Sequence, residues 1–133
     1  MLALRLRYAA AALCVVALGL LWRSPLVALS PFLRKYGGDA LWALMVYLGF
    51  RFLLAHRSPQ WSVGLALLFA TAIEFSQLYH PPWLDALREL RLGRLILGST
   101  FNWPDLPAYA FGIFAGAAVD VAARGSRSGL PPR

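Results

Sequence analysis

Four long stretches with almost no charged residues constrain the fold of this chain more than any other feature. The first, residues 8–22, has no charge at all and follows Arg5 and Arg7. A helix needs about 20 mainly apolar residues to cross the roughly 30 Å of hydrocarbon in a bilayer. With flanking residues included, we expect membrane-spanning helices over about residues 5–24, 38–55, 60–79 and 104–123.

The composition agrees with a membrane location. Hydrophobic residues make up 59% of the chain and charged residues 14%, whereas soluble domains average roughly 45–50% and about 25%. This excludes intrinsic disorder, a coiled coil and a disulfide scaffold, and Cys14 has no second cysteine to pair with. We therefore expect an all-α polytopic membrane protein, with one domain over residues 1–124 and a disordered tail over 125–133. A signal peptide over the first apolar stretch remains an alternative.

The segment between the third and fourth stretches is neither a short turn nor a full span. Apolar residues recur at helical spacing over residues 83–94, and charged residues occupy the positions between them. Such a pattern predicts an amphipathic helix lying in the membrane interface. The apolar run that follows, residues 95–101, is too short to cross, so we expect it to enter the membrane and return. Irregular backbone at that depth must be buried in protein or line a wet cavity.

The distribution of positive charge sets the expected orientation. Four spans place both termini on one side, and Lys and Arg are almost balanced across the membrane. Because the first helix usually dominates orientation, we expect both termini in the cytoplasm. Orientation does not explain Arg88, Arg91 and Arg94 on the outer face, which suggests contact with something anionic. Pairing with nearby acidic side chains or with lipid phosphates is the interpretation that we favour.

Ionisable groups inside a membrane are costly, so they are candidates for function. Helix spacing predicts that six residues converge at a polar site on the outer face: Asp39, Glu74, Gln77, Arg94, Asp105 and Tyr109. Arg34, Lys35 or Arg94 are the expected partners of Glu74. A structural ion pair is the alternative role for Glu74, and capping of helix N-termini is the role that we favour for Asp39 and Asp105.

Several kinds of chemistry are absent from the sequence. It has no phosphate-binding loop, nucleophile elbow, metal-ligand spacing or haem motif, so we expect no metal and no cofactor. The basic residues are dispersed between apolar spans, which argues against nucleic-acid binding. Gly112 and Gly116 lie one helical turn apart in the last span and predict close helix packing.

Several motifs resemble those of a family of small bacterial inner-membrane proteins catalogued as a domain of unknown function. The resemblance covers about residues 34–118 and includes the motifs at 35–43 (KYGGDALWA), 73–79 (IEFSQLY), 82–88 (PWLDALR) and 91–109. A more distant similarity links the chain to the VanZ-like family, one member of which is associated with teicoplanin resistance. The usual Asn of that family's last span is absent here. This second resemblance implies a shared site at Glu74, Gln77, Arg94 and Asp105.

These observations support three hypotheses about function. The first is a cell-envelope protein, without enzymatic activity, that binds an anionic lipid or glycan-linked headgroup at the polar site. The second is a membrane enzyme in which Glu74 acts as a base on a lipid-linked substrate. The third is a helix-packing subunit of a larger membrane complex. Catalytic residues are not identified, membrane lipid is the expected partner, and oligomerisation is left open.

Overall fold

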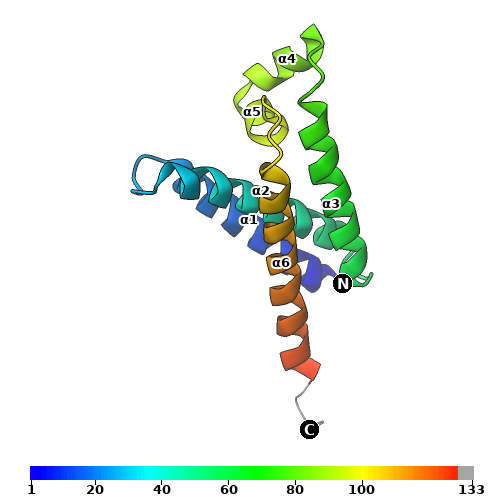
Figure 1. The fold of residues 1–133 in the computed structure, drawn as a ribbon. Helices are drawn as coiled ribbons and strands as arrows, with labels where there is room; N and C mark the ends of the chain where they lie inside the picture. The colour runs from blue at the N-terminus through cyan, green and yellow to red at the C-terminus, as the bar shows by residue number, and fades with distance from the viewer. Residues whose placement is uncertain (129–133) are drawn as a thin grey trace.

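The computed structural model describes residues 1–128, and these form six helices without a strand, so the expected all-α fold class is confirmed. The helices are α1 (Leu2–Arg23), α2 (Pro31–Leu53), α3 (Pro59–Ser76), α4 (Pro82–Glu89), α5 (Arg91–Leu97) and α6 (Asp105–Ser128). Helices α1 and α2 form an antiparallel pair that crosses α6 obliquely (Figure 1). Helix α2 packs against α1, α3 and α6, and α3 also packs against α6. The short helices α4 and α5 lie together at the end where α3 finishes and α6 begins (Figure 1).

Helix α2 begins seven residues before the predicted span, at Pro31 rather than residue 38. The Ser30 hydroxyl caps the helix by accepting a hydrogen bond from the backbone N–H of Leu33 at 3.2 Å. Proline suits the first helical position because the N–H it lacks would have no partner there. Asp39 therefore lies inside α2, and the interpretation of Asp39 as a helix cap is wrong.

The connection between α3 and α6 also differs from the expectation. The predicted single helix over 83–94 is two helices, because Leu90 has extended backbone angles (φ −67°, ψ 146°) and ends α4 before α5 begins. Helix α3 ends at Ser76 rather than residue 79. The predicted tail is helical over its first four residues, since α6 continues to Ser128, and its last five residues lie outside the described part of the chain.

Small residues let α6 approach α2 closely. A Cβ atom on Gly112 would collide with the backbone carbonyl of Ala40, and one on Gly116 would collide with the side chain of Leu44. Ala43 and Ile113 are fully buried in the same region. The sequence thus places its smallest side chains at the contact between the two helices that carry most of the polar residues discussed below.

Two helices are long and apolar enough to cross a membrane, namely α1 and residues 105–126 of α6. Only 6% of the apolar stretch of α1 is buried inside the protein, and Leu2, Leu6 and Leu13 are each more than half exposed. Helices α2 and α3 are not among these two; α2 carries Arg34, Lys35, Asp39 and Arg51, and α3 carries Glu74. The two apolar helices favour a membrane location, and the four-span topology stays a prediction.

Candidate functional site

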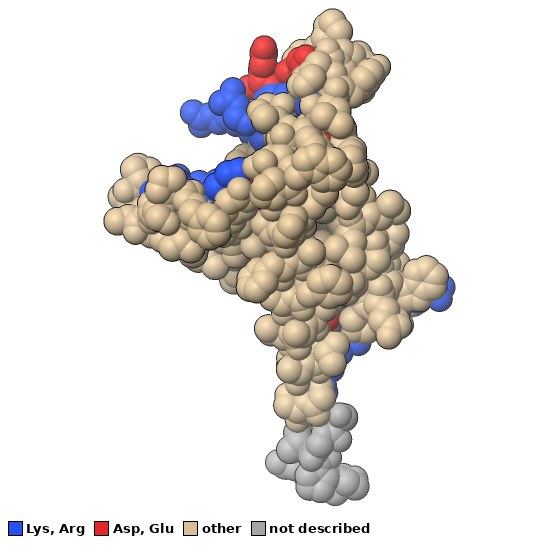
Figure 2. Space-filling model, viewed as in Figure 1, with Lys and Arg blue, Asp and Glu red and all other residues tan. Residues whose placement is uncertain are grey.

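A polar cavity of about 210 Å³ lies between α2, α3, α5 and α6. Five of the six predicted site residues line it: Asp39, Gln77, Arg94, Asp105 and Tyr109. Arg23 at the end of α1 and Lys35 near the start of α2 complete its charged wall. Figure 2 shows Lys and Arg side chains gathered around the hollow between the α1–α2 turn and the α4–α5 region. Elements distant in the chain therefore bring these groups together.

The two aspartates in the cavity wall are paired with cations. The Lys35 ammonium lies 2.9 Å from Asp105 Oδ1 and 3.4 Å from Asp39 Oδ2, while Arg23 lies 3.7 Å from Asp39. Burial alone would lower the pKa of Lys35, but its hydrogen bond to Asp105 and the charges of both aspartates outweigh burial and raise that pKa. Lys35 therefore stays charged and neutralises much of the acidic character of the wall.

Glu74 lies behind the cavity wall rather than in it. Its side chain is fully buried, and its two oxygens accept hydrogen bonds from the Tyr109 hydroxyl (2.8 Å) and the backbone N–H of Asn102 (2.7 Å). The expected cationic partners are therefore wrong, because Arg34 instead donates to two backbone carbonyls in the α1–α2 turn and Lys35 is held by the aspartates. Glu74 ties α3 to the start of α6 and positions Tyr109.

Two residues that line the cavity each have a buried polar atom without a hydrogen-bond partner among the described residues. Gln77 is only 5% exposed, and its amide nitrogen donates to the Leu97 carbonyl at 2.9 Å while its oxygen is unpaired. The indole N–H of Trp42 is also unpaired. Gly98 has φ 63°, and a Cβ there would collide with the Gln77 amide. Buried polar groups are nearly always satisfied, so these two atoms are candidates to bind a ligand.

The three arginines of the α4–α5 region have different environments. Arg88 is 4% exposed and donates to the carbonyls of Ser76 (2.7 Å) and Tyr79 (2.8 Å). It therefore satisfies the end of α3. It also pairs with Asp85 at 2.9 Å, which confirms for Arg88 the predicted pairing with a nearby acidic side chain rather than contact with an external anion. The Arg94 side chain is exposed in the cavity and makes no hydrogen bond or ion pair within residues 1–128. The Arg91 side chain is likewise unpaired among these residues but lies outside the cavity. Arg94 is thus the cation available to a ligand.

A second polar cluster, which the sequence analysis missed, lies near the other end of α6. Asp120 accepts hydrogen bonds from Tyr8 (2.7 Å) and Tyr47 (2.8 Å) and forms an ion pair with Arg51 at 2.9 Å. Arg51 is fully buried, and its remaining N–H groups donate to the Tyr8 hydroxyl and to two backbone carbonyls of the α2–α3 turn. The sequence feature that could have revealed this cluster is the presence of Asp120 in the last apolar stretch and of Arg51 in the second.

The groups that line the polar cavity can bind a ligand. Within residues 1–128, no group of three or more His, Cys, Asp and Glu side chains is arranged to hold a metal ion. His80 lies outside the cavity and pairs with Asp85 at 3.0 Å. What the cavity offers is one unpaired guanidinium, one unpaired indole N–H and one unpaired amide oxygen.

Comparison with known proteins supports the resemblance found in the motifs. The model of a family described as Protein of unknown function (DUF2809) matches residues 28–113. This range contains all but the last five residues of the predicted stretch 34–118, so the predicted relation to an uncharacterised domain is confirmed. No solved structure matches the chain.

Proposed function

Because the chain belongs to the DUF2809 family, whose function is unknown, we propose a function from its own geometry: the polar cavity binds the anionic headgroup of a membrane lipid. The observation that carries the proposal is Arg94, which faces the cavity without a partner among the described residues. The two aspartates in the wall are already matched by Lys35 and Arg23. An arginine left over in such a cavity favours a phosphate, which its planar guanidinium can bind through two parallel hydrogen bonds.

The proposal includes a place in the cell. Helices α1, α2, α3 and α6 would cross the inner membrane of a bacterium, with both termini in the cytoplasm and the polar cavity near the outer face. The exposed leucines of α1 and the arginines that precede its apolar stretch support this arrangement. The protein would then serve the cell envelope by holding a lipid at the outer leaflet, as the VanZ-like resemblance also suggests.

The test compares two neighbouring arginines of the same helix. Arg94→Gln removes the charge in the cavity, while Arg91→Gln removes an unpaired charge outside it and serves as the matched control. Each variant is purified in detergent micelles and titrated with phosphatidylglycerol and with phosphatidylcholine. We expect Arg94→Gln to weaken phosphatidylglycerol binding about tenfold or more, because a hydrogen bond to a charged group contributes about 1.5–3 kcal/mol. Equal loss in both variants would show nonspecific attraction and overturn the proposal.

The two other hypotheses have less support. Glu74 is fully buried and both its oxygens are engaged, which favours a positioning role over that of a general base. Gly112 and Gly116 are buried against α2 of the same chain, so they are not available to pack against another subunit. We therefore favour lipid binding over catalysis and over a purely structural role in a complex.

A further inference from the structure

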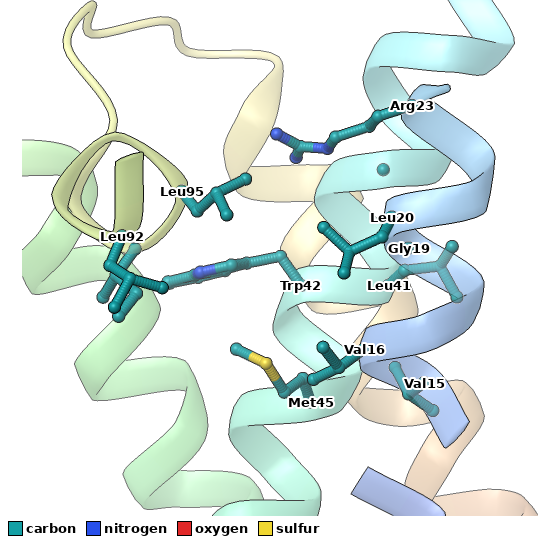
Figure 3. Close-up of a pocket in the computed structure, with 12 residues that line it drawn as sticks. Val15, Val16, Gly19, Leu20, Arg23, Leu41, Trp42, Met45, Leu92 and Leu95 are labelled. Carbon is teal, nitrogen blue, oxygen red and sulfur yellow. The ribbon is translucent and has the colours of Figure 1, made fainter. Parts of the chain in front are cut away.

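An apolar groove of about 250 Å³ continues from the polar cavity along the outside of α1 and α2 (Figure 3). Residues of α5 form its other wall. It shares four residues with the polar cavity, namely Arg23, Trp42, Leu95 and Ile96. The groove is otherwise lined by Val15, Val16, Gly19, Leu20, Gly38, Leu41, Met45 and Leu92. One site is thus charged at one end and apolar along the rest of its length.

The length of the groove fits a hydrocarbon chain that enters from one leaflet. Its residues on α1 run from Val15 to Arg23, and eight residues at 1.5 Å each span about 12 Å. The hydrocarbon of one leaflet is roughly 15 Å deep, half the thickness of the bilayer core. Figure 3 shows Arg23 at one end of the groove and Val15, Val16 and Met45 at the other. A lipid chain in the groove would therefore place its headgroup beside Arg23 and the polar cavity.

The unpaired polar atoms specify what the headgroup must carry. The oxygen of Gln77 can only accept a hydrogen bond, whereas the indole N–H of Trp42 can only donate one. A phosphodiester anion could accept from Trp42 and Arg94, but it has no hydrogen to donate to the Gln77 oxygen. A headgroup that has hydroxyl groups beyond its phosphate would satisfy all three.

We propose that the ligand is an anionic phospholipid with a hydroxyl-bearing headgroup, and that one of its acyl chains lies in the groove against α1. This inference rests on the proposed function for the anionic headgroup and adds the acyl chain and the hydroxyl group. The phosphate contacts Arg94, the hydroxyl donates to Gln77, and the chain covers Gly19 and the apolar residues around it.

Gly19 offers a direct test of the chain position. A Cβ on Gly19 meets no atom within 4 Å, so Gly19→Leu fills the groove without disturbing the fold. Gly64→Leu is the matched control, because Gly64 is also helical with open space around it but lies on α3 away from the groove. We expect Gly19→Leu to weaken binding of long-chain phosphatidylglycerol about tenfold, a loss equal to the burial of about two methylene groups. Binding of dihexanoyl phosphatidylglycerol should change less than about twofold, since its chains are too short to fill the groove.

Phosphatidylmethanol tests the hydroxyl group, because it carries the same charge as phosphatidylglycerol without a hydroxyl donor. We expect the wild-type protein to bind phosphatidylglycerol several-fold more tightly, and equal binding would overturn this part of the inference. If Gly19→Leu binds the long-chain lipid as well as Gly64→Leu does, the chain position is wrong. If Arg94→Gln still weakens binding in that case, the proposed headgroup site is retained and only the acyl-chain site is rejected. If Arg94→Gln has no effect, the proposed function itself fails.

Discussion

Removal of Asp120 is expected to be the most destabilising single change to a polar residue outside the cavity. Arg51 is fully buried and the Asp120 side chain is 9% exposed, so Asp120→Ala leaves a guanidinium in the interior without its counter-charge. The hydroxyls of Tyr8 and Tyr47 also lose their acceptor. Removing one partner of a buried ion pair typically costs about 3–5 kcal/mol, and we expect a loss in that range.

A conservative variant of Asp120 and a control at a second ion pair separate the effect of losing the charge on stability from that of losing the side chain. Asp120→Asn keeps an acceptor oxygen and should cost less, about 1.5–3 kcal/mol, because it weakens hydrogen bonds to a charged group without removing them all. Asp85→Ala disrupts another Asp–Arg pair, but the Asp85 side chain is 42% exposed, so we expect a smaller loss than for either Asp120 variant.

Thermal unfolding in detergent, followed by tryptophan fluorescence, measures these differences. The double variant Arg51→Met with Asp120→Leu removes both charges and should recover at least half of the loss seen in Asp120→Ala, since the penalty comes from the unpaired charge. Full recovery is not expected, because Arg51 also donates to the carbonyls of Leu54 and Arg57. A double variant no more stable than Asp120→Ala would refute the reasoning.

Three further outcomes follow from the structure. Gly112→Ala should destabilise the protein by about 1–3 kcal/mol in thermal unfolding, because its Cβ meets the Ala40 backbone, whereas Gly64→Ala should be neutral or stabilising. Glu74→Gln should preserve lipid binding within about twofold, because the amide can still accept from the Asn102 N–H and donate to the Tyr109 hydroxyl. Glu74→Ala loses both hydrogen bonds and should lose lipid binding. A large loss of binding in Glu74→Gln would instead indicate that the charge of Glu74 is required. The hydrogen bonds from His80 and then Arg88 hold the pKa of Asp85 below its ordinary value of 3.8, so its stabilising contribution is present above that value and is lost as pH falls through the lowered pKa. Carbon NMR titration of Asp85 should show the pKa rising in His80→Ala, and an unchanged pKa would contradict this assignment.

The sequence was sufficient to predict that the chain is helical and that several distant polar residues meet. Helical spacing places Asp105 and Tyr109 on one face of α6, and this periodicity does not depend on how the helices pack. The ends of the helices were harder to predict from the sequence, because the start of α2 depends on a local cap at Ser30 rather than on hydropathy. An apolar pattern marks the part of a helix that faces lipid or the core, and it does not mark where the helix ends.

The partners of buried charges could not be assigned from spacing alone. Glu74 and the arginines were expected to pair because opposite charges attract, yet Glu74 is satisfied by Tyr109 and the backbone of Asn102. Arg88 likewise binds backbone carbonyls at the end of α3. Neutral and backbone partners are invisible in a charge pattern, and they are available wherever a helix ends or a loop folds over a side chain.

The two polar clusters on α6 differ in how completely their groups are paired, and this difference separates their roles. Asp120 uses both oxygens and Arg51 donates from each of its three nitrogens, so that cluster is saturated by the protein itself. The cavity near Asp105, 15 residues earlier in α6, leaves Arg94 without a counter-charge and buried atoms of two further side chains unpaired. A network that only stabilises the fold gains nothing from unpaired buried groups, because each costs about 1–3 kcal/mol. The saturated cluster is therefore assigned to stability, and the unsaturated one to binding.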